Sequence, residues 1–275
     1  MTSPPRFDVD AFHRRAERER GHYAAALPFP HVVIDDFLPE EAVDVLVRAF
    51  DRPGDGWTYY HHVNERKRGF GRLDAMGPAA RAIVEDLNSA AFLRAIETLT
   101  GVDGLIADPD LDGGGLHETS PGGFLNVHTD FLSHTTKPHW SRQINFLLFL
   151  NRGWDDAYAG WLEFWNAENT AAVQKIAPVF NRCVIFRTTD RSFHGVPAGV
   201  RCPPGMTRKS LALYYFRDEG RPCALQPTRY VPRPEDPPLR RVLIHVDRWA
   251  LWGYSALKRY TPLGDRIVST ILRRF

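Results

Sequence analysis

The chain has 275 residues, of which 43% are hydrophobic and 25% are charged, with a formal net charge of +2. This is enough apolar sequence to bury a full core, in one large domain or two small ones. The near balance of charges argues neither for nor against a nucleic-acid partner, and we expect none.

The cysteines and the apolar segments indicate the compartment. The three cysteines lack the spacing of a zinc site, and an odd number is a poor disulfide framework, so reduced thiols are the default. The first residues lack the apolar segment of a secretion signal, and no stretch reaches the roughly 18 apolar residues of a membrane span. We therefore expect a cytoplasmic protein.

Helical patterns dominate the first hundred residues. Residues 8–26 are rich in Arg, Glu, His and Ala and predict a solvated helix, and residues 29–37 predict a strand. Residues 38–50 predict a second helix, because a proline and two acids stand at its start and apolar residues recur at helical spacing. Residues 78–99 predict one or two further helices whose apolar face packs against a sheet.

Residues 51–77 are the least regular part of the sequence. Five glycines interrupt an aromatic run, 57–62, and a charged run, 65–68. Such a segment suits a substrate lid, because loops on a rigid scaffold often supply specificity. A solvated charge run is the alternative, and both interpretations remain open.

From residue 105 to residue 217 the pattern changes to strands and turns. Residues 142–151 are nearly continuously apolar after Gln143, which predicts a strand that is covered on both faces. The apolar runs amount to about seven or eight short strands, the count of a jelly roll. We therefore predict a mainly β fold with flanking helices, in which a double-stranded β-helix (jelly roll) is backed by the N-terminal helices.

Three residues have the character of metal ligands. His128 and Asp130 are one residue apart, so on an extended strand both side chains leave the same face. His194 follows another strand after a short polar loop, as expected of a sheet that returns to the same place. Two histidines and one carboxylate on one face of a metal leave the opposite positions open, as in non-haem Fe(II) oxygenases. A His-x-Asp pair alone also occurs by chance in many proteins.

A fourth element follows His194 along the chain. Arg208 and Ser210 share one face of a third predicted strand, 208–216. A guanidinium fork beside a hydroxyl is suited to bidentate capture of a carboxylate. The ordered set of ligands and carboxylate anchor makes a chance His-x-Asp pair a poor explanation.

With these motifs the chain resembles the Fe(II)- and 2-oxoglutarate-dependent oxygenases, specifically their prolyl 4-hydroxylase-like branch. The resemblance covers about residues 29–220, and its most specific parts are residues 128–131, 142–151, 159–165, 178–182, 192–195 and 208–210. It implies that His128, Asp130 and His194 are the catalytic iron ligands and that Arg208 anchors the co-substrate. One departure is Ala159-Gly160, where relatives usually have two glycines.

The resemblance also implies a reaction. Fe(II), 2-oxoglutarate and O2 are the expected cofactors and co-substrates, with ascorbate as a stimulant, and succinate and CO2 are released as an unactivated C–H bond is hydroxylated. Ser210, Thr119 and His117 are candidates to help Arg208 hold 2-oxoglutarate. Related halogenases replace the carboxylate ligand by a small residue, so the presence of Asp130 favours hydroxylation.

The substrate is less well determined. Asn145, on a strand that faces the predicted pocket, is a candidate substrate contact, because a buried amide needs hydrogen-bonding partners. Arg142 and Trp161 are further candidates in the same half of the chain. The resemblance permits a peptidyl proline, a free amino acid or a small natural product, so we expect a small-molecule or peptidyl substrate.

The last 55 residues differ in composition from the rest. We predict an oxygenase domain over residues 1–220, with the jelly-roll core at about 105–217, and a proline-rich connector with a basic amphipathic helical tail over 221–275. Residues 239–275 carry eight Arg or Lys against two Asp. Such a tail can lie on an anionic membrane surface or dock a partner, and it can instead fold back on the core or form a dimer contact.

Two other classes of function compete with the oxygenase. A cupin-type metal dioxygenase or isomerase would use the same three ligands without 2-oxoglutarate, and a non-catalytic jelly-roll module would need no ligand set. Neither requires Arg208 and Ser210 at this position. Because a fold alone does not separate these classes, the co-substrate anchor decides in favour of the oxygenase.

Overall fold

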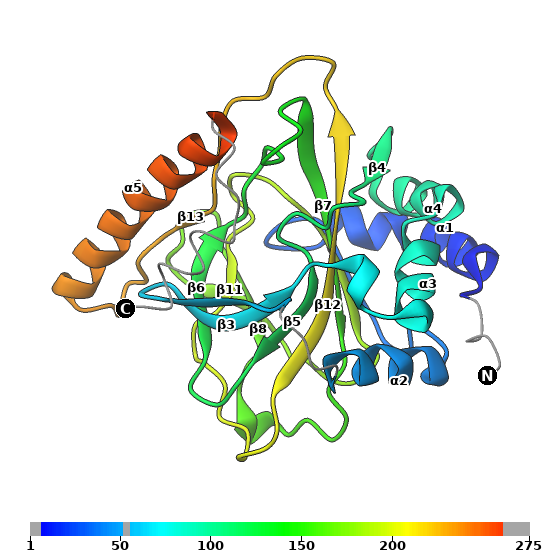
Figure 1. Cartoon of the computed structure of the whole chain (residues 1–275), viewed down its shortest axis with the longest axis horizontal. Helices are drawn as coiled ribbons and strands as arrows, with labels where there is room; N and C mark the ends of the chain where they lie inside the picture. The colour runs from blue at the N-terminus through cyan, green and yellow to red at the C-terminus, as the bar shows by residue number, and fades with distance from the viewer. Residues whose placement is uncertain (1–6, 52–55, 261–275) are drawn as a thin grey trace.

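The strand-forming sequence of residues 105–217 builds most of a curled sheet in the computed structural model of the chain. The structure describes residues 7–51 and 56–260, with the backbone alone at Ala250, Leu251 and 254–260. The end of the predicted tail, 261–275, lies outside the described residues. Within the described part the sheet has 13 strands, in agreement with the predicted jelly-roll fold (Figure 1).

Helices come first and last in the described chain. The α-helices are α1 (Val9–Ala25), α2 (Glu40–Arg48), α3 (Pro78–Leu87), α4 (Ala90–Thr100) and α5 (Pro238–Tyr260), and the short 3-10 helices are Ala49–Asp51, Leu73–Ala75 and Asp156–Tyr158. The helix starts follow local rules. The Asp8 side chain accepts a hydrogen bond from the Ala11 amide, Pro78 occupies the first turn of α3, and Ser89 caps α4.

The strands between them curl into a barrel. They are β1 (His31–Ile34), β2 (Thr58–His62), β3 (Glu65–Phe70), β4 (Leu105–Ala107), β5 (Gly115–Thr119), β6 (Phe124–Thr129), β7 (Trp140–Phe149), β8 (Leu162–Trp165), β9 (Ala172–Ile176), β10 (Cys183–Arg187), β11 (His194–Val196), β12 (Arg208–Asp218) and β13 (Arg229–Tyr230). Their spatial order is β1-β10-β7-β12-β5-β3-β6-β11-β8-β9, and β2, β4 and β13 pair with β3, β12 and β6. All pairings of these strands are antiparallel.

Strand β7 separates two cores by simple alternation. Its residues 144, 146 and 148 join the core beneath the helices, whereas 145, 147 and 149 line a cavity inside the barrel. Strand β12 behaves in the same way, with 211, 213 and 215 toward the helices and 210 and 214 toward the cavity. One face of β7 packs in the core and the other lines the cavity, which explains why its sequence is nearly continuously apolar.

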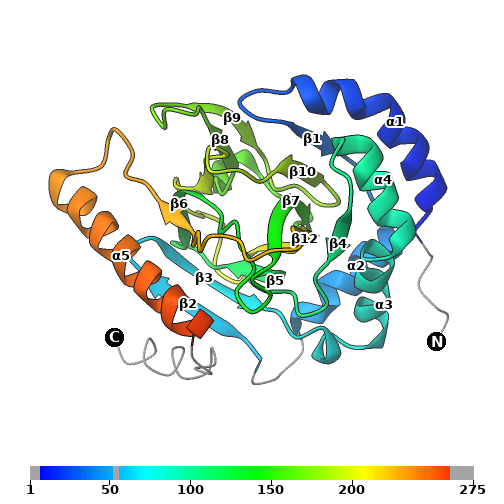
Figure 2. The ribbon, with the colours of Figure 1, turned by 90° about the horizontal axis from the view of Figure 1, so that it is seen from above.

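Helices α1 to α4 cover the outer face of the sheet on one side of the barrel, and α5 lies on the opposite side (Figure 2). Helix α1 packs on α4, where the rings of Phe12 and Phe92 stack with centroids 5.2 Å apart. Phe12, Ala16 and Tyr23 are buried. The predicted helix at 8–26 is therefore present, but it is solvated on one face only.

The irregular segment 51–77 contains a β-hairpin, β2 and β3, which the sequence did not predict. Strand β3 pairs with β5 and β6 as well as with β2, so its position depends on partners distant in the chain. These pairings outweigh the weak strand propensity of its charged residues. Residues 52–55 of the segment lie outside the described residues.

Two elements beyond residue 220 contact the barrel. Strand β13 pairs with β6, Arg229 opposite Thr129 and Tyr230 opposite His128. Helix α5 is amphipathic and buries Ile244 completely. In the described part of the chain, no helix is both long and apolar enough to cross a membrane.

Candidate active site

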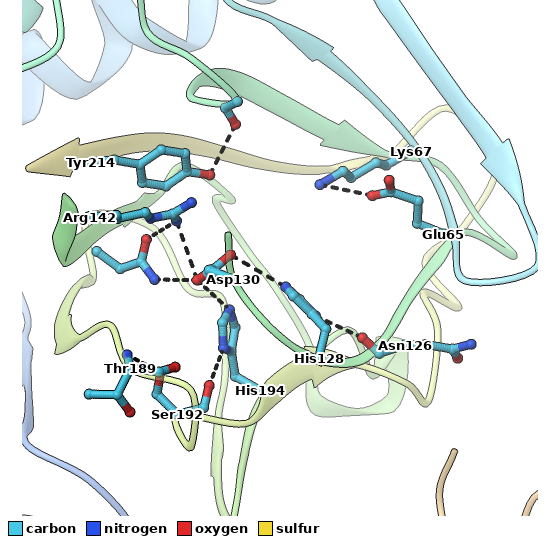
Figure 3. A network of polar contacts seen from close by, with 12 residues as sticks. Glu65, Lys67, Asn126, His128, Asp130, Arg142, Thr189, Ser192, His194 and Tyr214 are labelled. Carbon is cyan, nitrogen blue, oxygen red and sulfur yellow. Dashed lines mark hydrogen bonds and ion pairs between the residues drawn. The ribbon is translucent and has the colours of Figure 1, made fainter. Parts of the chain in front are cut away.

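Two neighbouring strands bring the three predicted metal ligands together. His128 lies near the end of β6, Asp130 directly follows that strand, and His194 begins β11, where it pairs with His128. The Nε2 atoms of His128 and His194 lie 3.6 Å and 3.4 Å from the Asp130 carboxylate oxygens. Figure 3 shows the three side chains pointing toward one another. The antiparallel pairing of β6 with β11 brings Asp130 and His194, which are 64 positions apart in the sequence, into one cluster.

Backbone carbonyls fix the orientation of both imidazole rings. The Nδ1–H of His128 donates to the carbonyl of Asn126, and that of His194 donates to the carbonyl of Ser192, each over 2.9 Å. Because a carbonyl only accepts, Nδ1 carries a proton in both rings, and Nε2 is the nitrogen that faces Asp130. Burial lowers the pKa of His194 to about 4, so this ring is neutral at pH 7. Metal-binding histidines typically donate their other ring N–H to a carbonyl or carboxylate in this way.

The Asp130 carboxylate is held in its ionised form by a second set of contacts. Asn145 Nδ2 donates to Asp130 Oδ2 over 2.6 Å, and Arg142 Nη2 lies 3.3 Å from the same oxygen. Burial alone would raise the pKa of Asp130, but Arg142 and the two histidines hold it well below its usual range. Arg142 also donates to Asn145 Oδ1, and its guanidinium lies 3.3 Å from the centre of the Tyr214 ring. Arg142 and Asn145, predicted as substrate contacts, thus both contact the carboxylate.

Behind the three ligands the barrel encloses a cavity of about 90 Å³, here called the inner cavity. Arg208 and Ser210 of β12 line it together with Thr119 and His117 of β5. Arg208 pairs with Thr119 and Ser210 with His117, so these four residues form one polar patch on two adjacent strands. Burial lowers the pKa of His117 to about 3, so this imidazole is neutral.

Arg208 is a buried cation without an acidic partner. Its Nε donates to the carbonyl of Gly160 over 2.8 Å, and its guanidinium lies over the Phe149 ring. Burial lowers its pKa to about 10, and within residues 7–51 and 56–260 it forms no ion pair. An isolated buried charge is costly unless a counter-ion arrives. The donor arrangement therefore fits a carboxylate ligand.

Gly160 allows this approach of Arg208. It has a φ of +71°, and a Cβ there would lie 3.0 Å from Trp154 and 3.3 Å from the Arg208 side chain. The preceding residue, Ala159, has a φ of +54°, a conformation that usually requires glycine. Ala159-Gly160, which departs from the expected Gly-Gly pattern, thus keeps the glycine beside Arg208 and places strain on its neighbour.

Sequence reasoning did not find two polar residues of the inner cavity, Lys67 and Tyr214. Lys67 Nζ lies 3.2 Å from Glu65 Oε2, and both side chains are largely buried, while Arg66 between them is exposed (Figure 3). The alternation of inward and outward charges in residues 65–68 was the available signal. It carries little weight without the strand, because a charge run alone normally indicates a solvated surface.

Trp161 and a second cluster of possible metal ligands lie away from the inner cavity. Trp161, predicted as a substrate contact, is not among the residues that line the inner cavity, and its Nε1 donates to Asp156. Asp108, Asp110 and His134 are close enough together to hold a metal. Lys137 Nζ lies 2.8 Å from Asp108 and 2.5 Å from Asp110, so an ammonium group already neutralises these carboxylates.

Comparisons with known proteins agree with this geometry. Residues 114–216 match the family model of the 2OG-Fe(II) oxygenase superfamily. A prolyl hydroxylase from Trichoplax adhaerens, solved with a hypoxia inducible factor peptide, is 18% identical, with a TM-score of 0.54 over 77% of this chain and 93% of that one. A Pseudomonas putida prolyl-4-hydroxylase is 17% identical, with a TM-score of 0.51 over 74% and 98%. At this identity the two structures are evidence for a shared fold.

No similar sequence is found among curated proteins. The matched residues 114–216 nevertheless include the His-x-Asp pair, His194 and Arg208. Oxygenases of this superfamily use Fe(II), 2-oxoglutarate and O2, and the donor sets described above suit the first two. Residues 114–216 are therefore a domain similar to the 2OG-Fe(II) oxygenase superfamily, on the fold of the prolyl hydroxylases, and the chain is an Fe(II)- and 2-oxoglutarate-dependent dioxygenase.

Proposed function

We propose that His128, Asp130 and His194 hold the Fe(II) ion. Their donor atoms all lie within 4.8 Å of one another, and all three residues are buried. Two neutral imidazole nitrogens and one carboxylate are the donor set of non-haem Fe(II) oxygenases. The carbonyls that orient both rings, and the amide of Asn145 on Asp130, keep the donors in place before metal arrives.

Arg208 binds the distal carboxylate of 2-oxoglutarate in this proposal, with Ser210 and Thr119 beside it. The observation that carries the assignment is the unpaired, buried guanidinium at the side of the inner cavity, which needs an anion. A volume of about 90 Å³ is far below the roughly 300 Å³ at which drug-sized pockets begin. It suits a small dicarboxylate and excludes a bulky substrate from the same space.

Bound Fe(II), with 2-oxoglutarate and O2, supplies the oxidising chemistry, in which the co-substrate becomes succinate and CO2 and a C–H bond of the substrate is hydroxylated. The residues of the chain bind and orient. Arg142 and Asn145 hold Asp130 ionised, so its second oxygen cannot swing away from the histidines. Phe149, Leu162 and Phe186 supply apolar walls of the inner cavity.

The substrate that we propose is amino-acid-like, a peptidyl proline or a small natural product. A peptidyl substrate has support from the fold, since the similar Trichoplax enzyme was solved with a peptide fragment. The C–H bond that reacts must approach the proposed metal site, beside Asp130, from outside the inner cavity. Halogenation is disfavoured, because Asp130 occupies the place that a halide would need.

Succinate production tests this proposal. Purified protein receives Fe(II), ascorbate and 2-oxoglutarate, with and without a panel of prolyl peptides, amino acids and small natural products. Arg208→Ala should lose about 30-fold or more of the turnover, because truncating one partner of a buried charge pair, here the pair with 2-oxoglutarate, costs about 2–5 kcal/mol. His128→Ala should lose turnover because it deletes a proposed metal ligand. Arg152→Ala is the matched control, since Arg152 pairs with Asp44 and Glu40 at the surface.

Calorimetry tests the metal-ligand assignment separately from the assignment of Arg208 to 2-oxoglutarate. Mn(II) should bind the Arg208→Ala protein but not the His128→Ala protein, whereas 2-oxoglutarate affinity should fall in Arg208→Ala. Arg208→Lys keeps the charge and loses the bidentate fork, so it should recover only part of the affinity. Equal 2-oxoglutarate binding by wild type and Arg208→Ala would contradict the anchor assignment.

A further inference from the structure

A second cavity of about 420 Å³, here called the outer cavity, is also lined by Asp130. Asp130 and Leu132 form its floor, residues 225–229 form one wall, and Arg248, Trp249 and Trp252 of α5 form another. The inner and outer cavities therefore share the carboxylate of Asp130. A molecule in the outer cavity therefore lies beside a proposed metal ligand and away from the residues that line the inner cavity with Arg208.

Helix α5 is attached to the barrel by specific polar contacts near the site. The Asp247 carboxylate accepts from Asn64 Nδ2 over 2.5 Å and lies 3.3 Å from His62 Nδ1, and Arg240 donates to Asn126 Oδ1 over 3.0 Å. Asn126 is the residue whose carbonyl orients His128. Helix α5 buries its own Ile244 completely and lies against β13 and β6, the strand that carries His128 (Figure 1).

The wall formed by residues 225–229 is attached as firmly. The Leu132 amide donates to the carbonyl of Gln226 over 2.9 Å, and Arg229 pairs with Thr129 across β13 and β6. Tyr230 follows with its ring centroid 5.4 Å from that of His128. These contacts hold the segment on both sides of Asp130, so the outer cavity has a built wall and not a loosely placed loop.

The chemistry of the outer cavity is aromatic and cationic. Trp249 and Trp252 leave 67% and 49% of their surfaces exposed, so their indole rings are open to a ligand that stacks on them. Arg229 and Arg248 line the same space, and neither forms an ion pair with another described residue. Asp190 is the only carboxylate besides Asp130 among the described lining residues. With Asp130 assigned to the metal, the remaining charges favour an anion.

We propose that the outer cavity binds the prime substrate, and that this substrate is a small anion with an aromatic or aliphatic body that stacks on Trp249 and Trp252. Its anionic group is held by Arg248 and Arg229. The volume lies within the roughly 300–1,000 Å³ of small-molecule sites. This inference rests on the proposed function and deepens it, because it assigns substrate selection to a helix that the sequence separates from the oxygenase domain.

Two fluorescent probes that differ in one charge test the inference. 8-Anilinonaphthalene-1-sulfonate is an aromatic anion, and N-phenyl-1-naphthylamine is its neutral counterpart. The double variant Trp249→Ala/Trp252→Ala should weaken binding of both probes about tenfold or more, because each indole contributes a stacking surface. Arg248→Gln should weaken the anionic probe about threefold to fivefold and leave the neutral probe unchanged.

Matched controls lie on the exposed face of the same helix. Val242→Ala and Arg241→Gln change an exposed apolar and an exposed basic residue of α5 that do not line the outer cavity. Both should bind the two probes as wild type does, within about twofold. Probe affinities that fall equally in controls and cavity variants, or in neither, would overturn the proposal.

The position of the probe is tested with paramagnetic metal. Mn(II) bound beside Asp130 should broaden the proton NMR signals of the bound anionic probe, and Zn(II) should not. Tryptophan-dependent binding without broadening would place the probe away from the metal and overturn the substrate role. If wild type binds neither metal nor 2-oxoglutarate, the proposed function fails, while the probe titrations still decide whether the outer cavity selects aromatic anions.

Discussion

The inner and outer cavities meet at Asp130 but are built in different ways. The inner cavity is walled by strands, and its polar residues Arg208, Ser210, Thr119 and His117 are positioned by sheet register. The outer cavity is walled by a helix and a connecting segment, and its indoles are largely exposed. A sheet fixes each side chain through several strand pairings, whereas α5 depends on a few polar contacts. Reaction chemistry and substrate choice are thus separable parts of this fold.

Removing the carboxylate that both cavities share should have the largest effect. Asp130→Ala deletes one of three proposed ligands and leaves Arg142 buried without its partner. We expect divalent-metal affinity to fall by at least about 1,000-fold and turnover to be lost. Calorimetry with Mn(II) measures the affinity. Asp44→Ala, at a surface ion pair, is the control, and metal binding retained in Asp130→Ala would show that the ligands lie elsewhere.

The attachment of α5 should depend on pH through His62. Burial disfavours its charged form, but hydrogen bonds to Asp247 and Glu65 outweigh this and raise its pKa to about 9. A folded-state pKa above the unfolded value of 6.5 stabilises the fold fully below pH 6.5, and this contribution is lost as pH rises through 9. We expect the free energy of unfolding to drop by up to about 3 kcal/mol across that window.

Urea denaturation at pH 6.5 and pH 9 measures this difference. His62→Gln removes the titrating group, so its stability should change little over the same range. His13→Gln is a suitable control, because His13 lies near Glu17 on the solvent-exposed face of helix α1. A wild-type stability that stays constant from pH 6.5 to 9 would show that the contact between α5 and β2 does not depend on a charged His62.

Loss of the hydrogen bond from Asn145 to Asp130 should have an effect of intermediate size on metal affinity. Asn145→Ala removes the 2.6 Å hydrogen bond to the carboxylate without touching the ligands themselves. Loss of such a supporting contact typically lowers metal affinity about 10-fold to 100-fold. Mn(II) titration checks this, with Asn166→Ala, whose side chain only caps an exposed turn, as the control. A change in thermal stability with unchanged metal affinity would make Asn145 a packing residue.

The smallest expected effect is a gain in stability. Ala159 adopts a φ of +54° beside the glycine that Arg208 contacts. Replacing it by glycine should relieve strain and stabilise the protein by about 1 kcal/mol, despite the greater flexibility of glycine in the unfolded chain. Thermal unfolding measures the change, and a loss of stability in Ala159→Gly would show that the backbone there is not strained.

Local pattern was enough to select the candidate metal and anchor residues, because the members of each pair are two positions apart on a strand or directly at its end. Residues 128 and 130, and residues 208 and 210, share a face through the two-residue period of a strand. The jelly roll followed from the number and spacing of apolar runs. By contrast, Lys67 and Glu65 looked like surface charges, because their burial depends on the pairing of β3 with β5 and β6.

The amino-acid sequence by itself determined the chemistry on each element: two histidines, a carboxylate and an arginine at strand positions, and a helix with tryptophans on one face. Only the tertiary structure decided which elements share a cavity. It brought His194 beside His128 across 66 positions of chain, and Trp249 and Trp252 to the cavity that reaches Asp130. The physical reason is that side-chain direction follows from local backbone geometry, whereas proximity between distant segments follows from non-local strand pairing and core packing.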